Sequence, residues 1–136
     1  MATIHELIRI ENDAICFGDY TLSEKAKLDN FEFSGDIYKV KTFKEITKLE
    51  RNGLFVYESV PGTAVFRFIE SDTRVEFTVE GSEDAQITLE LAEESEYEIT
   101  IDGASAGTMK TNLGGKLTFG VELEEAEDVT ILVEKK

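Results

Sequence analysis

From residue 54 onward, apolar and polar residues alternate with a period of two. Residues 74–80 place Val75, Phe77 and Val79 on one face, with charged or hydroxyl side chains on the other. The same pattern recurs in four later runs, at residues 86–91, 97–101, 117–123 and 129–133. Successive side chains of a strand point to opposite faces, so each run is typical of a strand with one apolar side. Gly, Asn, Asp and Ser separate the runs, and this spacing predicts an all-β, antiparallel β-sandwich.

The first part of the chain predicts shorter strands and tight turns. Asn12-Asp13, Ser34-Gly35, Asn52-Gly53 and Pro61-Gly62 all have the composition of turns between strands. Residues 20–30 are polar and lysine-rich, which favours a loop or a short helix that begins at Ser23. Residues 44–51 fit neither period well and could form a helical turn. We therefore expect a single domain, residues 1–136, with nine to eleven strands and at most one or two short helices, near 23–27 or 44–51.

The apolar faces identify a core and raise a question about sheet edges. The residues at the centres of the five regular runs should be buried: Phe77, Leu89, Ile99, Phe119 and Ile131. Residues 54–57 and 65–69 are apolar on both faces, which is typical of central strands or of strands beside an oligomer contact. The last run, 129–133, is flanked by charges and resembles a protected edge strand. Run 65–69 lacks such protection, so we expect a homo-oligomer that buries it or 54–57.

Charge excludes some partners. The net charge is −15; residues 1–51 hold eight basic and ten acidic residues, and residues 52–136 hold six basic and nineteen acidic. This field repels phosphate backbones and anionic lipids, so neither nucleic acid nor membrane is expected as a partner. Residues 25–51 carry seven of the fourteen cations, among them Lys39 and Lys41. This basic segment could meet an acidic ligand or the acidic part of another copy.

The N-terminus has no basic start followed by a long apolar stretch, so it does not resemble a signal peptide. No apolar run approaches the roughly 18 residues that a membrane-spanning helix needs. The lone Cys16 cannot form an intramolecular disulfide, which suits a reducing compartment. We therefore expect a cytoplasmic protein.

Catalytic chemistry has few candidates. His5 is the only histidine and Cys16 the only cysteine, and Cys16 lies between Ile15 and Phe17, where a cysteine usually behaves as a small buried apolar residue. Carboxylates cluster at 93–96 and 122–128, within turns, where we expect them to be solvated surface groups and not catalytic ones. A glycan-acting enzyme would need such carboxyls in a deep cleft. The sequence predicts no cofactor and no metal site, and it does not predict an enzyme.

Sugar binding by a β-sandwich usually requires exposed aromatic rings. The chain has nine Phe, four Tyr and no Trp, and most Phe fall on the apolar faces. Tyr20, Tyr38 and Tyr57 are the candidates, with Phe31 and Phe43 behind them. A carbohydrate-binding module would show these rings in an exposed row.

The C-terminal part resembles the end of bacterial Ig-like β-sandwich modules. The resemblance rests on Tyr97-Glu98-Ile99-Thr100-Ile101-Asp102-Gly103, followed by Gly107-Thr108, Thr111-Asn112 and Gly114-Gly115-Lys116-Leu117-Thr118-Phe119. In those modules a strand that ends in Asp-Gly turns into a short strand with Gly-Thr, and a Gly-rich turn leads to a final pair. The resemblance implies an Ig-like sandwich, and a jelly-roll-like one is the alternative. It implies no single function, because such modules serve as spacers, adhesion units and sugar-binding appendages.

Most of the chain also resembles a group of small bacterial proteins that are often labelled endosialidase. The similar stretches are residues 39–50, KVKTFKEITKLE, and residues 54–63, LFVYESVPGT. The group offers no established catalytic residues to carry over. Sialidase activity is not expected, because sialidases hold the sugar carboxylate with three arginines and carry Ser-x-Asp-x-Gly-x-Thr-Trp boxes. This chain has four arginines in all, no tryptophan and no such box.

Taken together, the sequence predicts a non-catalytic binding or assembly module with a homo-oligomeric or protein partner and a glycan as a further ligand class. The residues predicted to bind a ligand are Tyr20, Tyr38, Tyr57, Lys39 and Lys41. Two alternatives stay open: a carbohydrate-binding module and a small carboxylate-based glycan-acting enzyme.

Overall fold

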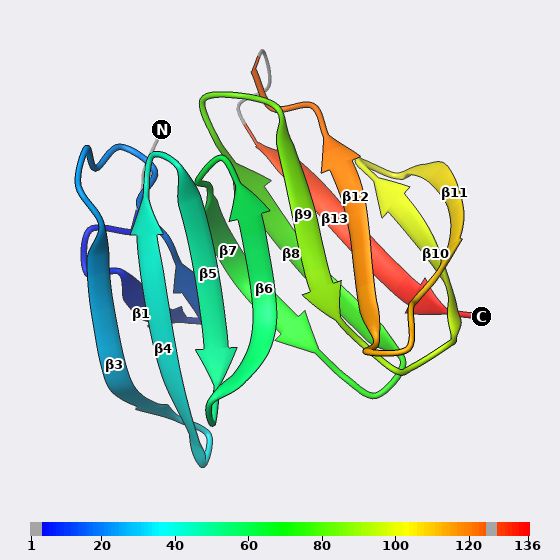
Figure 1. The fold of residues 1–136 in the computed structure, drawn as a ribbon, viewed down its shortest axis with the longest axis horizontal. Coiled ribbons are helices and arrows are strands. Elements are labelled where there is room, and N and C mark those ends of the chain that lie inside the picture. Colours follow the sequence, from blue (N-terminus) through cyan, green and yellow to red (C-terminus); the bar gives the residue numbers. More distant parts are fainter. Residues whose placement is uncertain (1–3, 125–127) are drawn as a thin grey trace.

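A computed structural model describes residues 4–124 and 128–136 and places them in two antiparallel β-sheets that pack face to face (Figure 1). Within these ranges the chain forms thirteen strands and no helix. The strands are β1 (Ile8–Glu11), β2 (Ala14–Phe17), β3 (Ala26–Phe33), β4 (Asp36–Phe43), β5 (Ile46–Arg51), β6 (Leu54–Val60), β7 (Ala64–Glu70), β8 (Arg74–Glu80), β9 (Ala85–Glu90), β10 (Glu96–Ile101), β11 (Ala104–Lys110), β12 (Lys116–Val121) and β13 (Val129–Lys135).

The seven-stranded sheet has the order β1-β2-β7-β8-β13-β10-β11, and the six-stranded sheet has the order β12-β9-β6-β5-β4-β3. In Figure 1 the six-stranded sheet lies in front, with β3 at the left edge. The prediction of an all-β antiparallel sandwich is confirmed. The described residues contain more strands than the nine to eleven expected.

The core lies between the two sheets and contains the residues that the alternating pattern identified. Phe77, Ile99 and Ile131 enter it from the seven-stranded sheet, and Leu89 and Phe119 enter it from the six-stranded sheet; none is more than 7% exposed. At its centre, the rings of Phe17 and Phe77 each meet the Tyr57 ring edge to face, with centroids 5.2 and 5.7 Å away. Such pairs add stabilisation beyond the apolar area they bury.

Four hairpins turn through two residues that both have positive φ, as type I′ turns require. The pairs are Asn12-Asp13, Ser34-Gly35, Asn52-Gly53 and Asp102-Gly103, with φ between 50° and 86°. These turns match the right-handed twist of the strands they join and fix the pairing register. The turns predicted at the first three pairs are therefore confirmed.

Neither segment considered for a short helix forms one, in agreement with the expectation of at most one or two short helices. Residues 23–27 lead into β3, and residues 44–51 form a hairpin turn and β5. In β5, Thr47 and Leu49 point into the core while Lys48 and Glu50 face outward, so the strand period holds despite the helix-forming composition. In β3 the register shifts between Leu28 and Phe31, and this bulge hides the alternation.

The edge strand expected at 129–133 is wrong, whereas the central strands offered as one alternative for runs 54–57 and 65–69 are confirmed. β13 lies between β8 and β10, while β6 and β7, which contain the runs 54–57 and 65–69, have hydrogen-bonded partners on both sides. Their remaining exposed apolar side chains are Leu54, Val60 and Ile69. The edges are β1, β11, β3 and β12, and all seven residues of β11 are exposed. The homo-oligomer stays a prediction. It cannot form by strand pairing along β6 or β7, because both strands are already paired on both sides.

No helix in the described ranges is long and apolar enough to cross a membrane. The cytoplasmic location stays a prediction.

Candidate functional site

Lysines gather on the outer face of the six-stranded sheet, where β3, β4 and β5 lie side by side. Alternation along β4 turns Val40 and Thr42 into the core, so Lys39 and Lys41 face outward. The pairing register then sets Lys41 directly opposite Lys27 on β3 and directly opposite Lys48 on β5. The result is a row of three amines on three adjacent strands. We call Lys27, Lys39, Lys41, Lys48 and Glu50 together the lysine face.

The lysine face surrounds a small hollow of about 80 Å³. Glu50 lies opposite Lys39, and its carboxylate forms an ion pair of 3.6 Å with Lys48 Nζ. Within the part of the chain that the structure describes, no ion pair engages the other three amines. Like charges directly opposite each other on a sheet lower its stability. This arrangement is therefore a local electrostatic cost.

Two phenylalanines border the lysine face and contact lysine amines. The Phe55 ring has Lys116 Nζ at 4.5 Å and Lys48 Nζ at 5.7 Å from its centroid. The Phe43 ring has Lys25 Nζ at 5.9 Å. Cation–π contacts of this kind attract the amines and limit where they can move. Of the amines in the lysine face itself, Lys48 is the one that these rings hold in place.

The structure brings together two of the five predicted ligand residues. Lys39 and Lys41 share the hollow, but the three tyrosines lie elsewhere. Tyr38 and Tyr57 point into the core, 7% and 0% exposed, because they occupy inward positions of β4 and β6. Neither therefore shows a ring face to solvent, so they do not form an exposed aromatic row, and their role as ligand residues stays a prediction.

Tyr20 is half-buried, and its hydroxyl donates a hydrogen bond of 2.9 Å to Glu80 Oε2. Burial and this bond to a carboxylate raise the pKa of Tyr20 to about 12. The side chain therefore stays a neutral donor held by Glu80, on a different part of the molecule from the lysine face.

Sequence reasoning placed Lys27 and Lys48 in the basic segment 25–51 without naming them as ligand residues, and it missed Phe55 and Lys116. The turn at 44–45 sets Lys48 opposite Lys41, whereas Lys27 faces Lys41 only because of the bulge between Leu28 and Phe31, which the sequence did not reveal. Lys116 belongs to β12, and its approach to Phe55 depends on β9 lying between β6 and β12. That order could not be predicted from the pattern of the chain.

A cysteine–histidine pair is not favoured by the geometry. Cys16 is fully buried in β2, where its sulfur accepts a hydrogen bond from the Arg67 backbone N–H at 3.3 Å. Burial raises the pKa of the Cys16 thiol, which disfavours the reactive thiolate. His5 has an exposed side chain whose Nδ1 lies 3.3 Å from the Asp19 carboxylate.

Buried carboxylates do exist, at Asp19 and Glu80, which are 2% and 3% exposed. Asp19 accepts hydrogen bonds from Thr21, and Glu80 accepts one from Tyr20. Neither residue lines the hollow of the lysine face.

The carboxylate clusters predicted in turns are not deeply buried where the structure describes them. In the cluster at 93–96, Glu93, Glu94 and Glu96 are exposed; residues 125–127 of the cluster at 122–128 lie outside the described residues. Among the described side chains, no three His, Cys, Asp or Glu are grouped closely enough to hold a metal ion.

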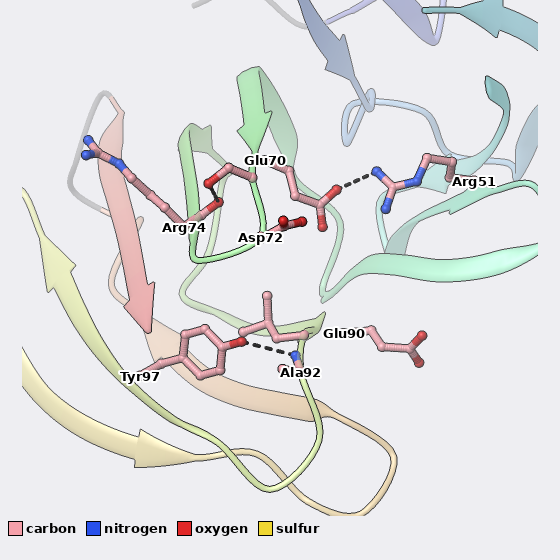
Figure 2. Close-up of a pocket in the computed structure, with 9 residues that line it drawn as sticks. Arg51, Glu70, Asp72, Arg74, Glu90, Ala92 and Tyr97 are labelled. Atoms are coloured by element: carbon pink, nitrogen blue, oxygen red, sulfur yellow. Dashed lines mark hydrogen bonds and ion pairs between the residues drawn. The ribbon is translucent and has the colours of Figure 1, made fainter. Parts of the chain in front are cut away.

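A larger cavity of about 390 Å³ lies at one end of the sandwich, where the β7–β8 turn approaches the start of the β9–β10 connection (Figure 2). The Arg51 guanidinium donates to Glu70 across the gap between the two sheets. Burial lowers the pKa of Arg51, but the hydrogen bond and charge of Glu70 outweigh it and leave the pKa raised. The Tyr97 hydroxyl accepts a hydrogen bond from the Ala92 backbone N–H at 3.1 Å.

Figure 2 shows Arg74 turned away from Arg51, so the two guanidinium groups do not converge on one point. Inside the cavity, Arg51 pairs with Glu70, and this contact joins the two sheets. The cavity lining carries charges of both signs, whereas four of the five residues of the lysine face are cationic, and among the described residues only Lys48 of the four forms an ion pair. The lysine face is therefore the stronger candidate site for an acidic ligand.

Comparison with protein-family models, curated proteins and solved structures found no match to this chain. The resemblances to Ig-like modules and to the group labelled endosialidase stay predictions.

Proposed function

We propose that this chain is a non-catalytic binding module that takes an acidic ligand on the lysine face. The observation that carries the proposal is the row of Lys27, Lys41 and Lys48 on adjacent strands, directly opposite one another. A protein with net charge −15 gains no solubility from grouping its few cations. The repulsion among these lysines lowers the stability of the free protein, and a bound anion would offset it. Folding does not explain why the lysines are grouped, whereas anion binding does.

The non-catalytic part of the proposal is supported by the state of the reactive groups. The Cys16 thiol is buried, and the Arg51 and Glu70 charges satisfy each other. The hollow of the lysine face is lined by a single carboxylate, Glu50, whereas glycoside hydrolysis needs a pair of carboxyls.

Binding of dextran sulfate, a polyanionic probe, tests the proposal. We expect the wild type to bind it despite the net charge of −15, and to bind more weakly as salt rises from about 50 to 200 mM. The triple variant Lys27→Gln, Lys41→Gln, Lys48→Gln should lose this binding.

The matched control is the triple variant Lys110→Gln, Lys135→Gln, Lys136→Gln, which removes the same charge from exposed positions at β11 and the end of β13. It should bind dextran sulfate as the wild type does. Equal binding by the two triple variants, or no binding by the wild type at low salt, would refute the proposal.

A further inference from the structure

We infer that the hollow of the lysine face takes the phosphomonoester group of a small hydroxylated molecule, that is, a sugar phosphate. The inference rests on the proposed function, since it names the acidic ligand of the same face. It follows from the size of the hollow, the kind of donors around it, their net charge, and the position of Glu50.

Size and donor type favour one compact oxyanion. A hollow of about 80 Å³ has room for only a few water-sized groups. Its donors are ammonium groups from three strands, each a point charge with three rotatable N–H bonds. The hollow contains no arginine, whose planar fork matches a planar carboxylate. Point donors arriving from several sides suit the three oxygens of a tetrahedral phosphate.

Net charge favours a dianion. Glu50 already forms an ion pair with Lys48, which leaves the amines of Lys27, Lys39 and Lys41 to be neutralised. A phosphomonoester carries about −1.5 to −2 at pH 7. A sulfate ester or a carboxylate carries a single negative charge and would leave more of the repulsion in place.

Glu50 favours a ligand with a hydroxyl beside its phosphate. Its carboxylate borders the hollow and can only accept hydrogen bonds, so it repels a bare oxyanion and attracts a hydroxyl donor. On β6, Phe55 lies directly opposite Glu50 and offers an apolar surface to a carbon skeleton. A sugar phosphate supplies the anion, the hydroxyl and the skeleton together, whereas inorganic phosphate supplies only the first.

Titration followed by two-dimensional amide NMR tests the inference, with glucose 6-phosphate as the probe and glucose 6-sulfate as its monoanionic match. At a pH of about 7.5, where the phosphate is mostly dianionic, we expect glucose 6-phosphate to bind at least about fivefold more tightly. The shifted amides should belong to β3, β4 and β5, and to β6 near Phe55. Glucose alone should shift none of them.

Three variants locate the contacts. Lys27→Gln with Lys41→Gln should weaken glucose 6-phosphate about tenfold, a loss of about 1.4 kcal/mol. Lys110→Gln, on β11, should leave the affinity unchanged. Glu50→Gln should reduce the preference for glucose 6-phosphate over inorganic phosphate, because the hydroxyl acceptor is weakened and the repulsion of the bare anion is removed.

Equal affinity for the phosphate and the sulfate ester, undiminished binding by the double lysine variant, or shifts confined to strands other than β3–β6 would each overturn the inference. Dextran sulfate binding that depends on the lysines, without binding of glucose 6-phosphate, would also overturn it while leaving the proposed function intact. Absence of both kinds of binding would refute both.

Discussion

Tyr57 and Thr63 bring their side-chain oxygens within 2.8 Å of each other at a place that solvent does not reach. Thr63 Oγ1 also lies 2.7 Å from Ser59 Oγ, and the Thr63 backbone carbonyl accepts a hydrogen bond of 2.7 Å from Thr47 Oγ1. This chain of buried hydroxyls ties the loop before β7 to β5 and β6. Burial raises the pKa of Tyr57, since the ionised phenolate would be left in an apolar core.

Tyr57→Phe should lower the free energy of unfolding by about 1 to 3 kcal/mol, because it leaves buried hydroxyls without their partner while the ring packing is kept. Urea denaturation measures the loss. Thr63→Val and the double variant complete a cycle, and the coupling energy between the two positions should be about 0.5 kcal/mol or more. Strict additivity of the two single changes would contradict a direct bond between them.

Phe77→Ala and Phe119→Ala should each cost about 3 to 5 kcal/mol, as large-to-small changes in a packed core do. The two rings enter the core from opposite sheets and are 1% and 7% exposed. Leu54→Ala is the control, because Leu54 is 66% exposed and its truncation should stay within about 0.5 kcal/mol. Losses below about 1 kcal/mol at both phenylalanines would mean that the inward faces are assigned wrongly.

Lys41→Gln should raise stability by about 0.2 to 1 kcal/mol, because Lys41 lies opposite both Lys27 and Lys48. The two effects have opposite signs: the change makes an already acidic protein more negative, which by itself would lower stability, so a gain can come only from the local repulsion. Chemical denaturation at low salt measures the gain, which should shrink near 1 M salt, where the Debye length is about 3 Å. Lys110→Gln, whose residue lies opposite Glu96, should give no gain. A loss of stability in Lys41→Gln would show that the row does not repel itself.

Alkaline pH should destabilise the fold through Tyr20. Burial and the hydrogen bond to Glu80 raise the pKa of Tyr20 from 10.0 to about 12. Below pH 10 both states keep the proton and the contribution is complete; between about pH 10 and 12 the unfolded chain ionises first, so stability falls. Tyr20→Phe should show a smaller fall over this window in a series of urea melts. An identical fall in both proteins would exclude Tyr20 as a source.

Regular alternation made much of the sandwich predictable, and its interruptions mark where prediction failed. The runs that became β8, β9, β10, β12 and β13 have one clean apolar face, and the type I′ turns carry Asn or Gly. In β3, the bulge at Asp29 and Asn30 moves Phe31 and Phe33 back toward the core side and breaks the period. Residues 44–51 fit neither period well in the sequence, but in the structure Thr47 and Leu49 of β5 are both fully buried, and this packing selects the strand.

The candidate site was only half predictable for a related reason. Lys39 and Lys41 stand out as cations two residues apart on a strand, whereas their meeting with Lys48 is a matter of register. In the sequence, Tyr57 is a candidate ligand residue because it is one of four tyrosines in a chain without tryptophan. It lies in run 54–57, which is apolar on both faces and therefore fits either a central strand or an oligomer contact. The order of strands, which decides between the two, is set by contacts distant in sequence.

β13 lies between β8 and β10 and is the strand that makes the seven-stranded sheet continuous. The set β1-β2-β7-β8 and the hairpin β10-β11 are separate units until β13 pairs with both. Pairing of Val79 with Val129 closes a long stretch of chain, and such non-local contacts form slowly compared with hairpins. We therefore expect the late step of folding to be the insertion of this strand, and the hairpins to form first.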